Sequence, residues 1–310
     1  MGMGSVRVTR TVLPGDAVMT TLEGAEPGPT VALLGGVHGD EDEGVLAVRR
    51  LLNLLNREEL AGRVKAVAPA NPVAWDAGTR VSPLDDGNLA RSFPGDGSGP
   101  TAALASALTS DLIDGADLLI DLHSAGVAYR MPLFCGFVGN VPGAERSRRA
   151  AEAFGAPLVW VHPTVGPGRS LTVAAERGIP ALYAECSGGG GIRSDELDFY
   201  VLGVLSVLAE FGALPARHRR FPSPMRWVHG GGDLDFGGQA AQHGLFVSVC
   251  EVGEEIAEGA EIGRMFGYDG DLLEVVRAPR RGVVMFLRRR ARTRAGEVLF
   301  AMSEATETPL

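Results

Sequence analysis

Apolar runs alternate with amphipathic runs over the first two thirds of the chain. Six short apolar runs have the length of buried strands, and they cover residues 31–37, 63–68, 117–122, 132–138, 157–161 and 180–185. Longer runs with helical spacing lie between or after them, at residues 43–56, 101–115, 143–154 and 195–211. This alternation predicts an α/β domain with a largely parallel sheet flanked by helices.

The pattern changes near residue 213. The stretch 212–227 is rich in proline and arginine and is typical of a linker. Short β-type runs follow, at residues 245–250, 261–266, 272–277, 282–287 and 297–302. We therefore predict two domains, residues 1–215 and a small all-β domain at residues 216–310. The run 272–287 resembles the hairpin of a biotinyl/lipoyl-type barrel, although Lys65 is the only lysine and lies elsewhere.

Residues 70–100 form a long stretch without a regular period. Stretches of this length inside a compact domain are usually functional loops or disordered segments. The apolar residues Trp75, Leu84, Leu89 and Phe93 favour an ordered loop.

Composition limits the class of protein. With 45% hydrophobic and 22% charged residues the chain is typical of a globular protein, and its net charge of −9 argues against a nucleic-acid partner. No apolar run is long enough to span a bilayer and no signal peptide is evident, so we expect a cytoplasmic protein without a membrane partner. The three cysteines are far apart, which excludes a CxxC-type zinc site and favours buried thiols.

The stretch GGVHGDEDEG, residues 35–44, places His38 beside four carboxylates at the end of a predicted strand. It is either an acidic helix start with a stray histidine or half of a metal site. His38 and Glu41 are three residues apart and can point the same way, and the two glycines before His38 allow a tight turn. The other three acids, Asp40, Asp42 and Glu43, are explained by the helix start, where negative charge is favoured.

A third ligand candidate is His123, at the end of the predicted strand 117–122. Ligands of open α/β sheets sit at the carboxyl ends of strands. Asp121 is on the same face by strand alternation and can hold the other imidazole nitrogen. With His38 and Glu41, His123 completes a His2Glu set, which is typical of catalytic zinc. Among the six histidines, only His38 and His123 end strongly apolar runs. We predict one Zn²⁺ per chain.

Five motifs in order carry a resemblance to a known family. They are HGDE (38–41), NPVAWDAGTR (71–80), NLARSFPG (88–95), DLHS (121–124) and AEC (184–186). Together they resemble the succinylglutamate desuccinylase/aspartoacylase family, which belongs to the zinc carboxypeptidase-like enzymes. The resemblance implies that fold, with a mixed and mostly parallel sheet, and zinc bound by His38, Glu41 and His123.

The resemblance also implies roles for further residues. Glu185 would be the general base that later protonates the leaving amine, and Arg80 would hold the oxyanion. Arg91 would grip a substrate carboxylate, Asn88 matches a common family position, and Arg169 is a further candidate for an anionic substrate group. The chain departs from the family at Ala90, where the family usually has asparagine.

These expectations favour a zinc-dependent amidohydrolase that deacylates a small N-acyl amino acid or N-acyl amine, with water activated by zinc as the nucleophile. In the resembling family, a β domain narrows the entrance to the site, which favours small substrates. Two alternatives stay open at this point. One is a zinc carboxypeptidase acting on short peptides, and the other is a catalytically weakened metal-binding protein, suggested by Ala90. Whether the chain forms a homo-oligomer also stays open.

Overall fold

The computed structural model describes residues 6–220, 225–230 and 237–305. All six strands predicted in the first two thirds are present, each within a few residues of its expected bounds. They are β3 (Glu26–Gly35), β4 (Ala61–Val67), β5 (Leu118–Leu122), β7 (Phe134–Val138), β8 (Leu158–His162) and β9 (Ala181–Glu185). Three predicted helices match equally well: α1 (Asp42–Leu55), α4 (Ala144–Phe154) and α6 (Ser194–Glu210).

Several elements were not predicted. Among those in the first two thirds of the chain are β1 (Arg7–Val12), β2 (Val18–Glu23), α2 (Pro72–Ala77) and α5 (Ser170–Glu176). Every residue of β1 is exposed, so it has no apolar alternation to detect, and α2 and α5 are too short to show a helical period. The predicted helix 101–115 is α3 (Pro100–Ala107), which continues as a π-helical segment, η3 (Leu108–Ile113).

The irregular stretch 70–100 is ordered, as its apolar residues predicted. It contains α2 and a 3-10 turn, η2 (Leu89–Arg91). Leu89 and Phe93 are buried, whereas Leu84 is exposed and does not anchor the loop.

The central sheet is mixed and mostly parallel, which confirms the predicted α/β class. The strand order is β1-β2-β4-β3-β5-β9-β7-β8, followed by β10 (Arg226–His229). The pairs β3–β4, β3–β5, β5–β9 and β7–β8 are parallel, and β7–β9 is antiparallel.

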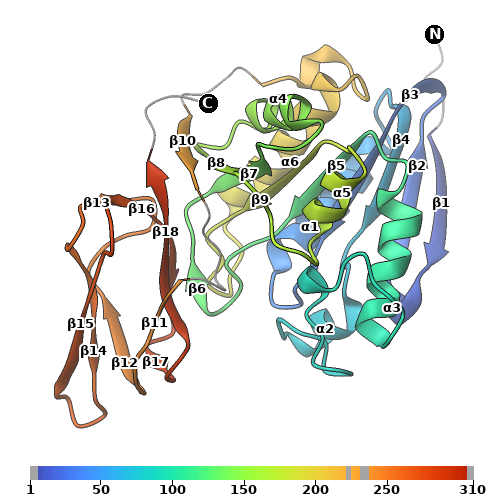
Figure 1. Cartoon of the computed structure of the whole chain (residues 1–310). Helices are drawn as coiled ribbons and strands as arrows, with labels where there is room; N and C mark the ends of the chain where they lie inside the picture. Colours follow the sequence, from blue (N-terminus) through green and yellow to red (C-terminus); the bar gives the residue numbers. More distant parts are fainter. Residues whose placement is uncertain (1–5, 221–224, 231–236, 306–310) are drawn as a thin grey trace.

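Helices cover both faces of this sheet (Figure 1). On β3, Val31 and Leu33 belong to the core formed with α1, α4 and α6. The alternate residues Ala32 and Leu34 belong to the core on the other face, with α3 and α5. A strand buried on both faces is continuously apolar, which is why the run 31–34 was detectable in the sequence.

The C-terminal part contains the predicted β-rich segment. Among the described residues, 237–305 hold strands and turns and no helix. The strands are β11 (Gly238–Gln239), β12 (Gly244–Ser248), β13 (Glu255–Ile256), β14 (Glu261–Phe266), β15 (Leu272–Arg277), β16 (Gly282–Arg288), β17 (Arg292–Thr293) and β18 (Val298–Ala305). The barrel type and the division at residues 215 and 216 stay predictions.

Strand pairings join the C-terminal strands to the rest of the described chain. β10 pairs with β8 on one side and with β18 on the other. β6 (Tyr129–Arg130), which follows His123 closely in the chain, pairs with β16. The C-terminal strands therefore contact the segment that leads away from a predicted metal ligand.

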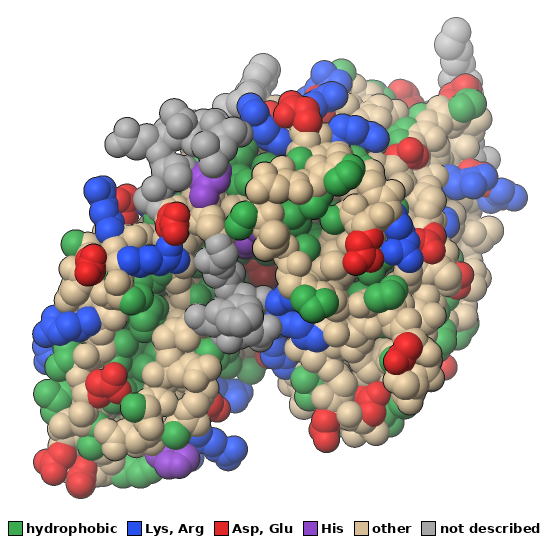
Figure 2. All heavy atoms as spheres, viewed as in Figure 1, with side chains coloured by type: hydrophobic (Ala, Val, Ile, Leu, Met, Phe, Trp, Pro, Cys, Tyr) green, Lys and Arg blue, Asp and Glu red, His purple; other side chains and the backbone are tan. Residues whose placement is uncertain are grey.

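The surface shows no gathering of one charge on the face seen in Figure 2, where acidic and basic side chains are interspersed. Within the part of the chain that is described, no helix has both the length and the hydrophobicity needed to cross a bilayer. The three cysteines are buried and form no disulfide.

The end of β3, the first turn of α1 and the end of β5 are in close backbone contact. A Cβ atom on Gly44, in the first turn of α1, would lie 2.4 Å from the carbonyl oxygen of Leu122 at the end of β5. A Cβ atom on Gly35, the last residue of β3, would lie 2.5 Å from the carbonyl oxygen of Gly44. Glycine is thus required at both positions for the helix start to sit against the two strand ends.

This contact predicts the effect of adding one methyl group. Gly44→Ala should lower the free energy of unfolding by about 1–3 kcal/mol, the usual cost of overpacking. Urea denaturation followed by circular dichroism measures it. Gly191→Ala is the matched control, because its Cβ atom would meet nothing within 4 Å. Equal stability of the two variants would contradict the tight contact.

Candidate metal centre and catalytic site

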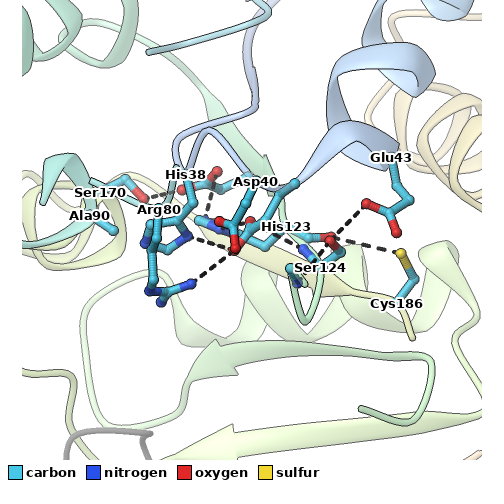
Figure 3. Close-up of polar contacts among 12 residues, drawn as sticks. His38, Asp40, Glu43, Arg80, Ala90, His123, Ser124, Ser170 and Cys186 are labelled. Atoms are coloured by element: carbon cyan, nitrogen blue, oxygen red, sulfur yellow. Dashed lines mark hydrogen bonds and ion pairs between the residues drawn. The ribbon is translucent and has the colours of Figure 1, made fainter. Parts of the chain in front are cut away.

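The three predicted metal ligands converge at the carboxyl ends of β3 and β5. His38 lies in the turn after β3, Glu41 directly precedes α1, and His123 directly follows β5. The two oxygens of Glu41 lie 2.7 Å from Nδ1 of His38 and 2.9 Å from Nδ1 of His123. All three side chains are buried, and they offer ligand atoms that lie within 4.8 Å of one another. Figure 3 shows the two imidazoles turned toward this point.

Asp121 supports His123 from the side away from Glu41. Its Oδ1 lies 3.1 Å from Nε2 of His123, as strand alternation predicted. Its Oδ2 accepts a hydrogen bond from the hydroxyl of Ser170, the first residue of α5. A carboxylate behind a metal-binding imidazole fixes the ring orientation and its tautomer, so Asp121 leaves Nδ1 of His123 available to a metal.

Burial and charge shift the pKa values of all three residues. Burial lowers the pKa of His38 to about 4, and the nearby Arg80 guanidinium acts in the same direction. Burial alone would raise the pKa of Glu41, but the two imidazoles lower it well below its usual value. Burial alone would lower the pKa of His123, but Asp121 and Glu41 raise it well above its usual value. The carboxylate is therefore held ionised at the centre of the group.

The donor set fits a divalent cation. Two imidazoles and one carboxylate are ligands that catalytic zinc sites use. Among the described residues, Nε2 of His38 is buried without a hydrogen-bond partner. In the described part of the chain, His38, Glu41 and His123 form the group of side chains that could hold a metal ion.

Glu185 reaches the same place from the neighbouring strand. It ends β9, and the pairing of Leu122 with Ala184 sets the end of β9 beside the end of β5. Within the described residues, Oε2 of Glu185 is buried without a hydrogen-bond partner. Burial raises the pKa of Glu185 well above its usual value, and the charge of His123 opposes this rise. A carboxyl group in this environment is suited to accept and return a proton.

A cavity of about 330 Å³ brings the predicted site residues together. Its lining includes the three metal-binding candidates, Glu185 and the arginines Arg80, Arg91 and Arg169. Nη1 of Arg80 lies 3.2 Å from Glu41. Ala90 also lines the cavity and presents a methyl group there.

Asn88 is the predicted site residue that the structure places outside this lining. Its side-chain oxygen accepts a hydrogen bond from the backbone N–H of Ala90 at 3.1 Å and caps the turn η2. In this geometry Asn88 shapes the segment that carries Arg91.

Several cavity residues were not identified from the sequence. They are Met131, His162, Ser170, Tyr183 and Phe286, among others. The hydroxyl of Tyr183 lies 2.7 Å from Nε2 of His162. Tyr183 is two residues before Glu185 on β9, so strand alternation could have found it. Phe286 comes from β16, and no local pattern links it to the site.

The acids beside Glu41 each have a specific partner. Asp42 is exposed and accepts a hydrogen bond from the indole N–H of Trp75 at 2.8 Å. Asp40 accepts one from the backbone N–H of Val127 at 3.3 Å. Glu43 lies in the first turn of α1, as predicted, but it is also buried and accepts a hydrogen bond from the Ser124 hydroxyl at 2.7 Å, which the helix start does not explain. Burial raises the pKa of Glu43 to about 7.

The comparison with protein families agrees with this geometry. Residues 27–211 match the model of the succinylglutamate desuccinylase/aspartoacylase catalytic domain. The chain belongs to the succinylglutamate desuccinylase/aspartoacylase family. The predicted family is thus confirmed.

Individual relatives cover nearly the whole chain. The N-alpha-acetyl-L-2,4-diaminobutyric acid deacetylase of Halomonas elongata is 32% identical over 289 residues, which are 91% of this chain and 84% of that protein. The product-bound ectoine utilization protein EutE (DoeB) from Ruegeria pomeroyi is 25% identical, with a TM-score of 0.86 over 98% of this chain and 100% of that one. A succinylglutamate desuccinylase/aspartoacylase from Rhodobacter sphaeroides is 28% identical, with a TM-score of 0.85 over 99% and 98% of the two chains.

As a member of the succinylglutamate desuccinylase/aspartoacylase family, the chain is a hydrolase that removes acyl groups from amides. The predicted enzyme class is therefore confirmed. The His38, Glu41 and His123 group is compatible with the metal dependence of such enzymes.

The raised pKa of Glu185 predicts a pH effect on stability. The folded state holds the Glu185 proton more tightly than the unfolded state, so this contribution to stability is complete below the ordinary pKa and is lost as pH rises. In chelator-treated protein, Glu185→Gln should therefore be more stable than wild type at pH 8, with a smaller difference at pH 5. Thermal unfolding at both pH values measures this. If the stability advantage of Glu185→Gln over wild type became smaller as pH rises, the predicted direction of the pH effect would be contradicted.

Proposed function

We propose that the chain is a zinc-dependent deacylase that hydrolyses a small N-acyl amino acid or N-acyl amine. The observation that carries this is the position of Glu185, a half-buried residue with an enclosed Oε2 atom and a raised pKa, on the cavity that also holds His38, Glu41 and His123. Family membership supports amide hydrolysis, and the His2Glu donor set supports zinc.

His38, Glu41 and His123 would hold the metal. When bound, zinc supplies a Lewis acid that polarises the acyl carbonyl and lowers the pKa of water to about 7. Asp121 keeps the His123 ring in the orientation that presents Nδ1. The buried carboxylate of Glu41 supplies negative charge without access to bulk water.

Glu185 moves the proton. Its carboxylate takes a proton from the attacking water and passes it to the departing amine, so that a neutral amine leaves. The Arg80 guanidinium, on the cavity wall beside Glu41, is placed to stabilise the negative charge that develops on the carbonyl oxygen. No acyl-enzyme forms on a side chain in this scheme.

The shape of the cavity favours a small substrate over a peptide. Phe286 of β16 and Met131, next to β6, supply apolar wall on the side of the C-terminal strands. A volume of about 330 Å³ is near the lower end for small-molecule sites. Arg91 and Arg169 line the same cavity and suit an anionic group of the substrate. Ala90 lines the same cavity, and its side chain offers no hydrogen bond there.

The mechanism predicts separate effects on metal content and turnover. Wild-type protein should contain about one zinc per chain. Glu185→Gln should keep that metal and lower kcat by roughly 10²–10⁴-fold, the usual contribution of a general base. Metal analysis and steady-state kinetics measure the two quantities. Undiminished turnover in Glu185→Gln would remove Glu185 from the mechanism, and protein without metal after careful handling would contradict the zinc site.

A substrate screen tests the proposed function as a whole. N-acetyl and N-succinyl amino acids and diamines, including Nα-acetyl-L-2,4-diaminobutyrate, should release a free amine when zinc is supplied, and short peptides should be poor substrates. The Halomonas relative makes the diaminobutyrate derivative the first compound to test. Faster cleavage of the peptides would favour the carboxypeptidase alternative. Metal binding without hydrolysis of any compound would favour the catalytically weakened alternative.

A further inference from the structure

The helices α1 and α6 each have a buried glutamate in the first turn. Glu43 is the second residue of α1, and Glu196 is the third residue of α6. Both side chains are buried, at 4% and 8% exposure, although the acids that directly precede them, Asp42 and Asp195, are exposed. Each glutamate accepts a hydrogen bond from a serine hydroxyl that closely follows a residue of the site.

The first of these contacts joins α1 to the segment after β5. The hydroxyl of Ser124 donates to Glu43 at 2.7 Å, and the backbone N–H of the same serine donates to Glu41 at 3.2 Å. Ser124 is the residue after His123. His123 is therefore linked through Ser124 to the segment that carries Glu41 and Glu43; Figure 3 shows Ser124 beside His123.

The second contact joins α6 to the segment after β9. Both the backbone N–H and the hydroxyl of Ser187 donate to Glu196. Ser187 is two residues after Glu185, and it precedes the glycine run 188–191. Glu196 therefore fixes the chain where it leaves the general-base candidate.

A favourable helix-dipole interaction does not account for the burial of these two carboxyl groups. Negative charge at a helix start is favourable at the exposed surface, as Asp42 and Asp195 illustrate. Burying a carboxyl group costs free energy unless it is hydrogen-bonded. The structure keeps both glutamates buried and gives both a serine partner, which indicates a positional task for each.

We propose that Glu43 and Glu196 are positioning residues with separate tasks: Glu43 fixes Ser124 so that His123 and Glu41 keep their metal-binding geometry, and Glu196 fixes the segment that follows Glu185. This inference rests on the proposed zinc-dependent function. Loss of Glu43 impairs metal binding, whereas loss of Glu196 impairs turnover with the metal retained.

The test measures metal affinity and kinetics on the full-length protein. Glu43→Ala should weaken zinc binding by roughly 10–100-fold in competition with a chelator, as loss of a group behind a metal ligand usually does. It should also change the visible spectrum of the cobalt-substituted protein. Glu43→Gln keeps an oxygen that accepts from Ser124, so it should recover most of the affinity.

The matched variant lies at the other helix. Glu196→Ala should bind zinc as tightly as wild type and show a lower kcat with little change in KM. Asp195→Asn removes a charge next to Glu196 but no buried hydrogen bond, so it should leave both quantities unchanged. If Glu43→Ala does not fold, Ser124→Ala removes the same hydrogen bond with the loss of one oxygen atom.

The outcomes separate this inference from the proposed function. Wild-type protein that binds no zinc and hydrolyses no acyl amide would overturn the proposed function. Wild-type protein that binds zinc, with Glu43→Ala and Ser124→Ala binding it equally well, would overturn the inference alone. Equal loss of zinc affinity in Glu43→Ala and Glu196→Ala would also overturn it, because the two tasks would then not be separate.

Discussion

The site depends on a backbone contact between the ends of β3 and β5 and the start of α1. Gly35 and Gly44 have no side chains there, so the first turn of α1 packs directly against Leu122. This contact fixes the distance between the turn that carries His38 and Glu41 and the strand end that carries His123. The ligands come from segments about eighty residues apart in the chain. A metal site shared between these two segments requires that the distance between their backbones stays fixed.

The electrostatics of the site follow from that packing. Placing a carboxylate, two imidazoles and a second carboxyl group in one water-poor place shifts their pKa values in opposite directions. The two imidazoles stabilise Glu41 as the anion, whereas burial destabilises the anion of Glu185 more than the charge of His123 stabilises it. A bound cation would favour the charged form of both carboxyl groups. Such a cation would relieve this unfavourable arrangement, and a cost to stability of this kind is expected at functional sites.

The sequence pattern predicted most of the central sheet and the core of the site, for identifiable reasons. The buried runs 31–34 of β3 and 118–120 of β5 are continuously apolar, so these strands and the residues at their ends were detectable. Asp121 followed from strand alternation. β1 was missed because it is exposed along its whole length. The contact of Glu43 with Ser124 was missed because the helix-start rule is local, whereas Ser124 lies 81 residues away. Phe286 was missed because it reaches the cavity only through the pairing of distant strands.

The strand β16 contacts the site in more than one way. β16 contributes Phe286 to the cavity wall, and it also pairs with β6, in the segment that leads away from His123 and Ser124. Beyond the end of β16, the side chain of Arg289 lies close to Gly189 in the glycine run after Glu185. Both functional strand ends, at His123 and at Glu185, thus continue into segments that contact residues 286–289. A change in how β16 packs would therefore act on the cavity wall and on both of these segments together.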